Sequence, residues 1–317
     1  MLRKIITPLL AVMLTAASLA GCSDTSRSDS GKLSIVCTIF PIYDWTREIV
    51  GSNNDGVELT YLMSSGADLH NYQPTAKDMI TISDCDVFIY LGGESDEWVE
   101  DSLSEARNKD MTVISLMDVL GSSVREEELK EGMEAEDDMG YDEHIWLSLR
   151  NAETCVREIC SSLEAVDSDN ANVYSSNADS YISRLNELDV SFTELTANAK
   201  NKTLIFGDRF PFRYFVEDYG LDYYAAFLGC SSDSGASFRT VAFLADKADE
   251  LNADTIFAIE GSDCSIAEAV ISVTKTKSQE LTVLDSVQSV TKQQADSGIS
   301  YINIMEKNYD VLKEALN

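Results

Sequence analysis

Positive charge is scarce in this chain. Of its 317 residues, 24 are Lys or Arg and 55 are Asp or Glu, so the formal net charge is −31. A surface this acidic repels phosphate backbones and attracts cations, which excludes nucleic-acid binding and docking on anionic lipid through a basic face. With 44% hydrophobic and 25% charged residues the chain is globular, and its length is enough for about two domains.

Common catalytic and metal-cage motifs are also missing. The chain contains no HExxH helix motif, no GxSxG elbow and no Gly-rich phosphate loop. It has no CxxC pair either, which argues against a zinc cage built from thiolates. We therefore predict that the protein is not an enzyme. A metal-dependent hydrolase that uses Glu143, beside His144, as general base is a minor alternative.

The N-terminus predicts export. Arg3 and Lys4 precede an apolar run over residues 5–17, and the run is followed by Leu-Ala-Gly-Cys at 19–22. This pattern resembles a bacterial lipoprotein cleavage box, with residues 1–21 as signal peptide and Cys22 as the lipid-bearing N-terminus; an ordinary signal peptide is the alternative. Residues 22–32 form a polar tether. No later segment is apolar enough to cross a membrane, so we expect a protein anchored by its lipid to the outer face of the bacterial cell membrane.

Six cysteines remain after Cys22, and their spacing matches no compact disulfide framework. Cys37 lies in an apolar strand pattern, and Cys85 and Cys155 lie in helical patterns. We interpret most of the six as free thiols of the core and leave their disulfide state open. Cys230, between Gly229 and Ser231, is interpreted as a loop cysteine, although a thiolate ligand at that position would favour zinc.

Apolar runs of strand length alternate with helical spacings along most of the chain. Four runs precede residue 167 and four follow residue 200; they lie at 33–40, 57–62, 87–91, 113–116, 204–206, 223–227, 255–259 and 281–284. The alternation predicts an α/β fold with two Rossmann-like βα lobes, each with a mostly parallel four-stranded sheet. We place the N-terminal lobe at 33–167 and the C-terminal lobe at 201–317.

One long amphipathic helix is expected between the lobes, at 168–200. Its apolar residues recur at alternating spacings of four and three: Tyr174, Ala178, Tyr181, Leu185, Leu188, Phe192 and Leu195. About 30 residues of helix span about 45 Å. Because the connection is a helix rather than flexible strands, we expect small local motions and no wide hinge closure.

An acidic insertion interrupts the first lobe. Residues 126–143 include ten acidic residues and one Lys, and the segment leads directly to His144. It is either a solvated loop or a loop that gathers cations for a site at that histidine.

Only two histidines occur in the whole chain, His70 and His144. His70 follows the second predicted strand, in the position where open α/β sheets bind ligands. Asp208, Glu260 and Asp285 each follow a predicted strand of the second lobe. These residues either have structural roles or form a divalent transition-metal site between the lobes.

Several motifs resemble the solute-binding lipoproteins of bacterial zinc and manganese ABC transporters, the ZnuA/TroA-like metal-binding family. The matching stretches are Phe-Pro-Ile-Tyr-Asp-Trp at 40–45, Gly66–Pro74 around His70, Tyr-Leu-Gly-Gly at 90–93 with Glu97-Trp98, His-Ile-Trp-Leu-Ser at 144–148, Tyr-Gly-Leu at 219–221 and Leu-Asp-Ser at 284–286. The resemblance covers nearly all of the chain after residue 32. It implies two βα lobes joined by one long helix, and a protein that passes a metal ion to a permease.

The resemblance also implies a ligand set, taken over position by position. His70 and His144 match the first two ligands, and Asp285 matches the carboxylate ligand after the last strand. Arg209 occupies the position of the third ligand, although a guanidinium has no free lone pair for a cation. Asp208 is a less certain substitute and Glu260 a weak one, and Arg209 itself is expected to orient Asp208 or Asp285.

We therefore predict a monomeric, extracytoplasmic lipoprotein that captures Zn²⁺, in preference to Mn²⁺, and delivers it to an ABC permease. The ion is the transported ligand. One alternative is the same fold binding a chelated metal or an anionic solute through Arg209 and Arg213. A surface adhesin is another.

Overall fold

The computed structural model describes residues 31–52, 54–134, 140–231 and 235–316. The predicted signal peptide, Cys22 and nearly all of the tether lie outside these residues, as does part of the acidic insertion. Among the described residues, no helix is long and apolar enough to cross a membrane.

Two four-stranded sheets, each entirely parallel, form the centres of two lobes, as predicted. The strands are β1 (Leu33–Cys37), β2 (Val57–Tyr61), β3 (Val87–Tyr90), β4 (Thr112–Ser115), β5 (Thr203–Phe210), β6 (Asp222–Leu228), β7 (Thr255–Ile259) and β8 (Glu280–Leu284). The strand orders β2-β1-β3-β4 and β6-β5-β7-β8 are equivalent, so the two lobes share one topology.

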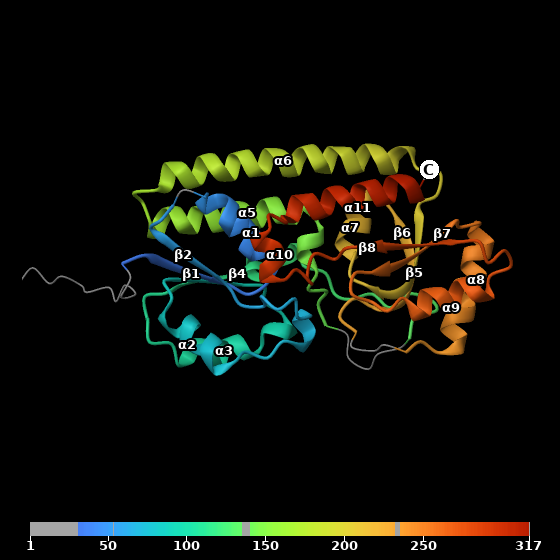
Figure 1. The fold of residues 1–317 in the computed structure, drawn as a ribbon, viewed down its shortest axis with the longest axis horizontal. Coiled ribbons are helices and arrows are strands. Elements are labelled where there is room, and N and C mark those ends of the chain that lie inside the picture. Colours follow the sequence, from blue (N-terminus) through green and yellow to red (C-terminus); the bar gives the residue numbers. More distant parts are fainter. Residues whose placement is uncertain (1–30, 53, 135–139, 232–234, 317) are drawn as a thin grey trace, which may run out of the picture.

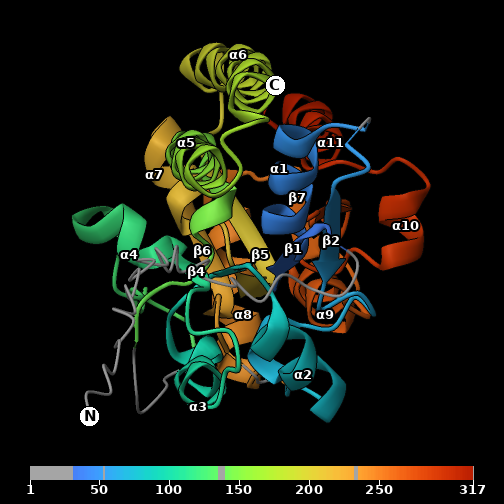
Figure 2. The ribbon, with the colours of Figure 1, turned by 90° about the vertical axis from the view of Figure 1, so that its left-hand side faces the viewer.

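Helices cover both sheets (Figures 1 and 2). They are α1 (Phe40–Val50), α2 (Ala76–Asp84), α3 (Trp98–Ser104), α4 (Leu116–Leu120), α5 (Leu149–Val166), α6 (Ala171–Asn198), α7 (Arg213–Tyr219), α8 (Phe238–Leu251), α9 (Ser265–Val273), α10 (Lys292–Asp296) and α11 (Tyr301–Ala315). Short 3₁₀ turns occur at Leu69–Asn71, Glu94–Asp96, Gly121–Ser123 and Ile145–Leu147.

The long helix α6 runs across both lobes (Figure 1). It packs against α1 and α5 of the first lobe and against α7 and α11 of the second. Every apolar residue predicted for its inner face is buried. With 28 residues it is about 42 Å long, close to the prediction.

Two strands, β1 and β5, differ from the prediction by more than one residue at one end. The first strand ends at Cys37, and Phe40 already belongs to α1, because Pro41 suits the first helical turn, where its missing N–H needs no partner. The strand predicted at 204–206 continues to Phe210 through a register irregularity between Phe206 and Arg209. Asp208 therefore lies inside β5 and does not follow it.

Buried hydrogen bonds join the lobes beneath α6. The indole N–H of Trp146 donates to the carbonyl of Ser286 (2.7 Å), and the hydroxyl of Tyr301 donates to the carbonyl of Trp146 (2.5 Å). The backbone N–H of Tyr301 donates to Asp44 (2.7 Å). One apolar core continues through both lobes, from β1 to α11. The expectation of small motions between the lobes stays a prediction.

Candidate metal site

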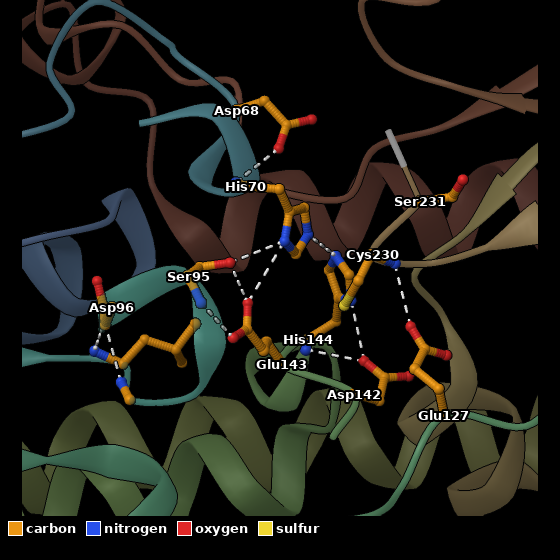
Figure 3. Close-up of polar contacts among 12 residues, drawn as sticks. Asp68, His70, Ser95, Asp96, Glu127, Asp142, Glu143, His144, Cys230 and Ser231 are labelled. Atoms are coloured by element: carbon orange, nitrogen blue, oxygen red, sulfur yellow. Dashed lines mark hydrogen bonds and ion pairs between the residues drawn. The ribbon is translucent and has the colours of Figure 1, made fainter. Parts of the chain in front are cut away.

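His70 and His144 meet between the lobes. His70 lies in the 3₁₀ turn that follows β2, and His144 directly precedes the turn at Ile145–Leu147. Their Nε2 atoms are 3.4 Å apart. His144 is fully buried and His70 is partly buried. Figure 3 shows the two rings next to each other, with the side chain of Cys230 beside the ring of His144.

The Nδ1 atom of each ring has a partner on the opposite side. Nδ1 of His144 is 2.9 Å from Oδ1 of Asp142, which also accepts the backbone N–H of His144 (2.9 Å). Nδ1 of His70 is 2.9 Å from the hydroxyl of Ser95 and 3.4 Å from Oε2 of Glu143. Such outer partners fix the orientation of metal-ligating imidazoles and leave Nε2 for the ion.

Burial and neighbouring polar groups shift the pKa values of Glu143 and His144 in opposite directions. Burial would raise the pKa of Glu143, but hydrogen bonds from His70 and Ser95 outweigh it and hold that pKa below its ordinary value. Burial would lower the pKa of His144, but the hydrogen bond and charge of Asp142, with a contribution from Glu127, raise it. Asp142 and Glu127 thus stabilise positive charge at the imidazole of His144.

The described part of the acidic insertion is not simply a solvated loop. Glu127, Asp142 and Glu143 are buried. The segment packs on the second lobe, where the backbone N–H of Glu134 donates to the carbonyl of Ala226 (3.0 Å). Its last residues therefore supply the partners of both histidines. The Glu143 carboxylate accepts hydrogen bonds from Ser95, which does not suit a free general base.

Cys230 is the site residue that the sequence analysis did not select as a ligand. Among the described residues, two groups of three side chains bring ligand atoms within 4.8 Å of one another: His70 with His144 and Cys230, and Glu127 with Asp142 and Cys230. Burial and the carboxylates of Asp142 and Glu127 raise the pKa of the Cys230 thiol well above its ordinary value. The signal available in the sequence was its place just after a strand of the second lobe.

The three carboxylates predicted as ligands lie in other surroundings. Asp208 accepts the backbone N–H of Ile259 (3.3 Å) and of Arg209 (2.9 Å). Glu260 accepts both the backbone N–H (2.7 Å) and the hydroxyl of Ser286 (2.6 Å). Asp285 accepts the backbone N–H of Val287 (2.8 Å). None of the three joins the histidine group among the described residues, so their role as ligands stays a prediction.

Glu260 and Asp285 nevertheless influence each other electrostatically. Burial and the charge of Asp285 raise the pKa of Glu260 to about 7. Burial also raises the pKa of Asp285. Glu260 and Asp208 line a cavity of about 540 Å³, together with Asp68 and Arg209.

Arg209 bridges the lobes. Its guanidinium bonds Asp68 (2.7 Å) and the carbonyl of Ser231 (3.2 Å), whereas the sequence analysis expected Asp208 or Asp285 as its partner. Asp68 also accepts the backbone N–H of His70 (3.1 Å), so Arg209 supports the turn that carries this histidine. Arg213 pairs with Glu217 (3.0 Å). Both guanidinium groups have acidic partners, which does not favour an anionic solute.

The described cysteines are free thiols, and four of them are buried: Cys37, Cys85, Cys155 and Cys160. Cys230 and Cys264 are partly exposed. This agrees with the interpretation of most cysteines as core thiols.

Comparisons with known proteins show which family this chain resembles. Residues 35–315 match the family model described as ZnuA, zinc-uptake complex component A, periplasmic. The high-affinity zinc uptake system protein ZnuA of Bacillus subtilis is 30% identical over 305 residues, which cover 94% of this chain and 93% of that protein. The zinc-binding lipoprotein AdcA of Streptococcus pneumoniae strain R6 is 30% identical over 309 residues, which cover 96% of this chain but only 60% of AdcA.

A solved structure shares the fold. It is the Zn(II)-bound ZnuA-like domain of Streptococcus pneumoniae AdcA, with a TM-score of 0.72, 29% identity and coverage of 90% of this chain and 99% of that domain. The family match extends over nearly all described residues, and the two-lobed parallel architecture agrees with it. The chain therefore belongs to the ZnuA family of periplasmic zinc-uptake components.

Proposed function

We propose that this protein captures Zn²⁺ outside the cell membrane and delivers it to an ABC permease. The observation that carries the proposal is the pair of Nε2 atoms 3.4 Å apart, each on a ring whose Nδ1 has a partner. Two nitrogens at Zn–N distances of about 2.0–2.1 Å in a tetrahedral site are separated by about 3.3–3.4 Å. His70 and His144 are therefore spaced for one zinc ion.

Zinc is preferred to manganese in this proposal. Imidazole nitrogens suit Zn²⁺, whereas Mn²⁺ is typically bound by carboxylates, carbonyls and water. Both curated relatives have zinc in their names, and the solved domain contains Zn(II). The acidic surface, with a net charge of −31, raises the local cation concentration.

The remaining parts of the proposal concern place and partner. The sequence predicts a lipid on Cys22, a monomer on the outer face of the membrane, and a permease as the receiver of zinc. The AdcA relative is named a lipoprotein. The buried bonds of Trp146 and Tyr301 across the lobes support release through local ligand displacement. A large change in radius of gyration by X-ray scattering on zinc addition would contradict this mode of release.

Titration calorimetry of the metal-free protein with Zn²⁺ and with Mn²⁺ tests the function. We expect one tight zinc site and weaker manganese binding. His70→Ala and His144→Ala should each abolish tight binding, because each removes one of two nitrogen ligands. Tight zinc binding that persists in both variants would refute the proposed site.

The predicted carboxylates are tested in the same assay. Asp208→Asn, Glu260→Gln and Asp285→Asn keep the size of each side chain and remove its charge. A strong loss of affinity in one variant identifies a carboxylate ligand. Unchanged affinity in all three removes them from the ligand set without affecting the histidines.

A further inference from the structure

The loop after β6 brings a sulfur atom to the two histidines. Cys230 lies two residues beyond the end of β6, and its ligand atom is within 4.8 Å of those of His70 and His144. The close-up view shows its side chain directed to the His144 ring (Figure 3). The two histidines belong to the first lobe and the cysteine to the second, so the group spans the space between the lobes.

Packing and hydrogen bonds hold this loop against the histidines. A Cβ built on Gly229 would lie 3.1 Å from Nδ1 of His144 and 2.9 Å from the carbonyl oxygen of Phe210, so the loop backbone packs directly on the imidazole. The backbone N–H of Cys230 donates to the buried carboxylate of Glu127 (3.0 Å). The carbonyl of Ser231 accepts from Arg209 (3.2 Å). Contacts on both sides thus hold Cys230 facing the histidines.

We propose that Cys230 is a zinc ligand, and that its sulfur and the Nε2 atoms of His70 and His144 form the protein part of the zinc centre. This inference rests on the proposed function. Sulfur and imidazole nitrogen are preferred zinc ligands, with Zn–S about 2.3 Å and Zn–N about 2.0–2.1 Å. These bond lengths place sulfur and nitrogen about 3.6 Å apart in a tetrahedral site. Because the three ligand atoms lie within 4.8 Å of one another, each sulfur–nitrogen separation has to shorten by at most about 1.2 Å to reach that distance.

Arg209 makes this assignment more specific. It occupies the sequence position where the family resemblance places a third ligand, and its guanidinium cannot bind a cation. In β5, Arg209 is in register with Phe227 of the neighbouring strand β6. The ends of these two strands lie side by side, and Arg209 bonds the carbonyl of Ser231, so the loop just after β6 reaches the same region between the lobes as Arg209.

The binding step is a proton exchange. The S–H bond of Cys230 breaks, its proton passes to solvent or buffer, and the sulfur electron pair forms the Zn–S bond. The positive charge of the ion stabilises the thiolate. Because thiolate is a soft ligand, the site discriminates against Mn²⁺ more strongly than a site of nitrogen and oxygen atoms alone.

Cobalt substitution tests the assignment directly. Co²⁺ bound by a thiolate has a sulfur-to-metal charge-transfer absorption in the near ultraviolet, which nitrogen and oxygen ligands do not produce. The purified protein and its Cys230→Ser variant are titrated with Co²⁺ and then with Zn²⁺ in competition with a chelator. Cys264→Ser is the matched control, because Cys264 is the other partly exposed thiol in the part of the chain that the structure describes. Thermal melting of the metal-free proteins verifies folding.

We expect the band in the wild type and in Cys264→Ser but not in Cys230→Ser. Loss of a residue that only supports a metal ligand lowers affinity by about 10- to 100-fold. The loss of zinc affinity in Cys230→Ser should be larger than this. Cys230→His should recover part of the affinity without the band. Tight zinc binding in the wild type without a sulfur band, and unchanged in Cys230→Ser, would overturn the assignment and leave the proposed function standing. No tight binding in the wild type would refute both.

Discussion

Replacing Asp142 by Asn tests how far the support of His144 determines zinc affinity. Asp142 is fully buried, and one of its oxygens is 2.9 Å from both the backbone nitrogen and Nδ1 of His144. Asn keeps an oxygen of similar position but removes the charge that makes the imidazole a better ligand. Loss of such an outer partner typically costs 10- to 100-fold in metal affinity, which is about 1.4–2.7 kcal/mol.

The same change alters the pH dependence. Asp142 is the largest contributor among those that raise the pKa of His144. In the wild type, competition between protons and zinc for Nε2 therefore begins at a higher pH. Zinc affinity falls as the pH falls through the raised pKa of His144. In Asp142→Asn this loss begins at a lower pH. The affinity difference between the two proteins should thus be largest near neutral pH and narrow in acid.

The assay is zinc competition with a fluorescent chelator over a pH series, with the exposed Asp110→Asn as control for the change in net charge. We expect the control to match the wild type within about twofold, since exposed single charges contribute little. An affinity of Asp142→Asn equal to that of the wild type at neutral pH would refute the reasoning. A difference that widens in acid would do so as well.

Three further variants probe packing and burial. Gly229→Ala should lower zinc affinity, because its Cβ would lie 3.1 Å from the ring of His144; zinc titration measures this. Asp44→Asn should reduce the pH dependence of stability. Burial raises the pKa of Asp44 from 3.8 to about 6, so the folded state favours the protonated carboxyl. The wild-type free energy of unfolding, measured with urea, should therefore fall by about 3 kcal/mol as the pH rises through that value. Tyr301→Phe should cost about 1–3 kcal/mol of unfolding free energy, because the carbonyl of Trp146 loses a buried donor.

Each of these variants has a decisive comparison. Gly235→Ala is the control for Gly229→Ala, since a Cβ there meets no atom of the described residues within 4 Å; equal zinc affinity of the two variants would contradict the steric argument. The raised pKa of Asp44 would be contradicted if the free energy of unfolding of the wild type rose steadily from acid to neutral pH and that of Asp44→Asn changed in parallel. An unchanged urea midpoint and slope in Tyr301→Phe would show that the bond between the lobes adds nothing to stability.

Much of the fold could be predicted from local pattern. All eight predicted strands are present, and the inner face of α6 is the predicted one. These features depend on near neighbours in the chain, through periodicity and turn residues. One difference was not predictable from local pattern: the irregularity in β5 lets the strand pass through Asp208, and this irregularity depends on pairing with β6 and β7. The residues of β5 taken alone do not reveal that pairing.

The candidate site likewise has features that the sequence indicated and features that depend on the fold. The rarity of histidine and the position of His70 after a strand indicated a metal site from the sequence alone. That His144, 74 residues later, joins His70 was one of two interpretations of the residues, and the family resemblance favoured it; the structure brings the two Nε2 atoms to 3.4 Å from each other. The buried partners Asp142 and Glu143 adjoin His144 in sequence, but only the fold directs one of them to His144 and the other to His70.

The sequence by itself therefore determined the class of the protein: two parallel βα lobes, a long helix between them and an acidic surface. Tertiary structure alone decided which atoms meet. Arg209 bonds Asp68 across the lobes, and Cys230 faces His144 from a loop 86 positions away. The physical reason is that strand and helix patterns are local properties of the chain. The distance between two ligands on different lobes depends instead on how the lobes pack, which is a property of the whole core.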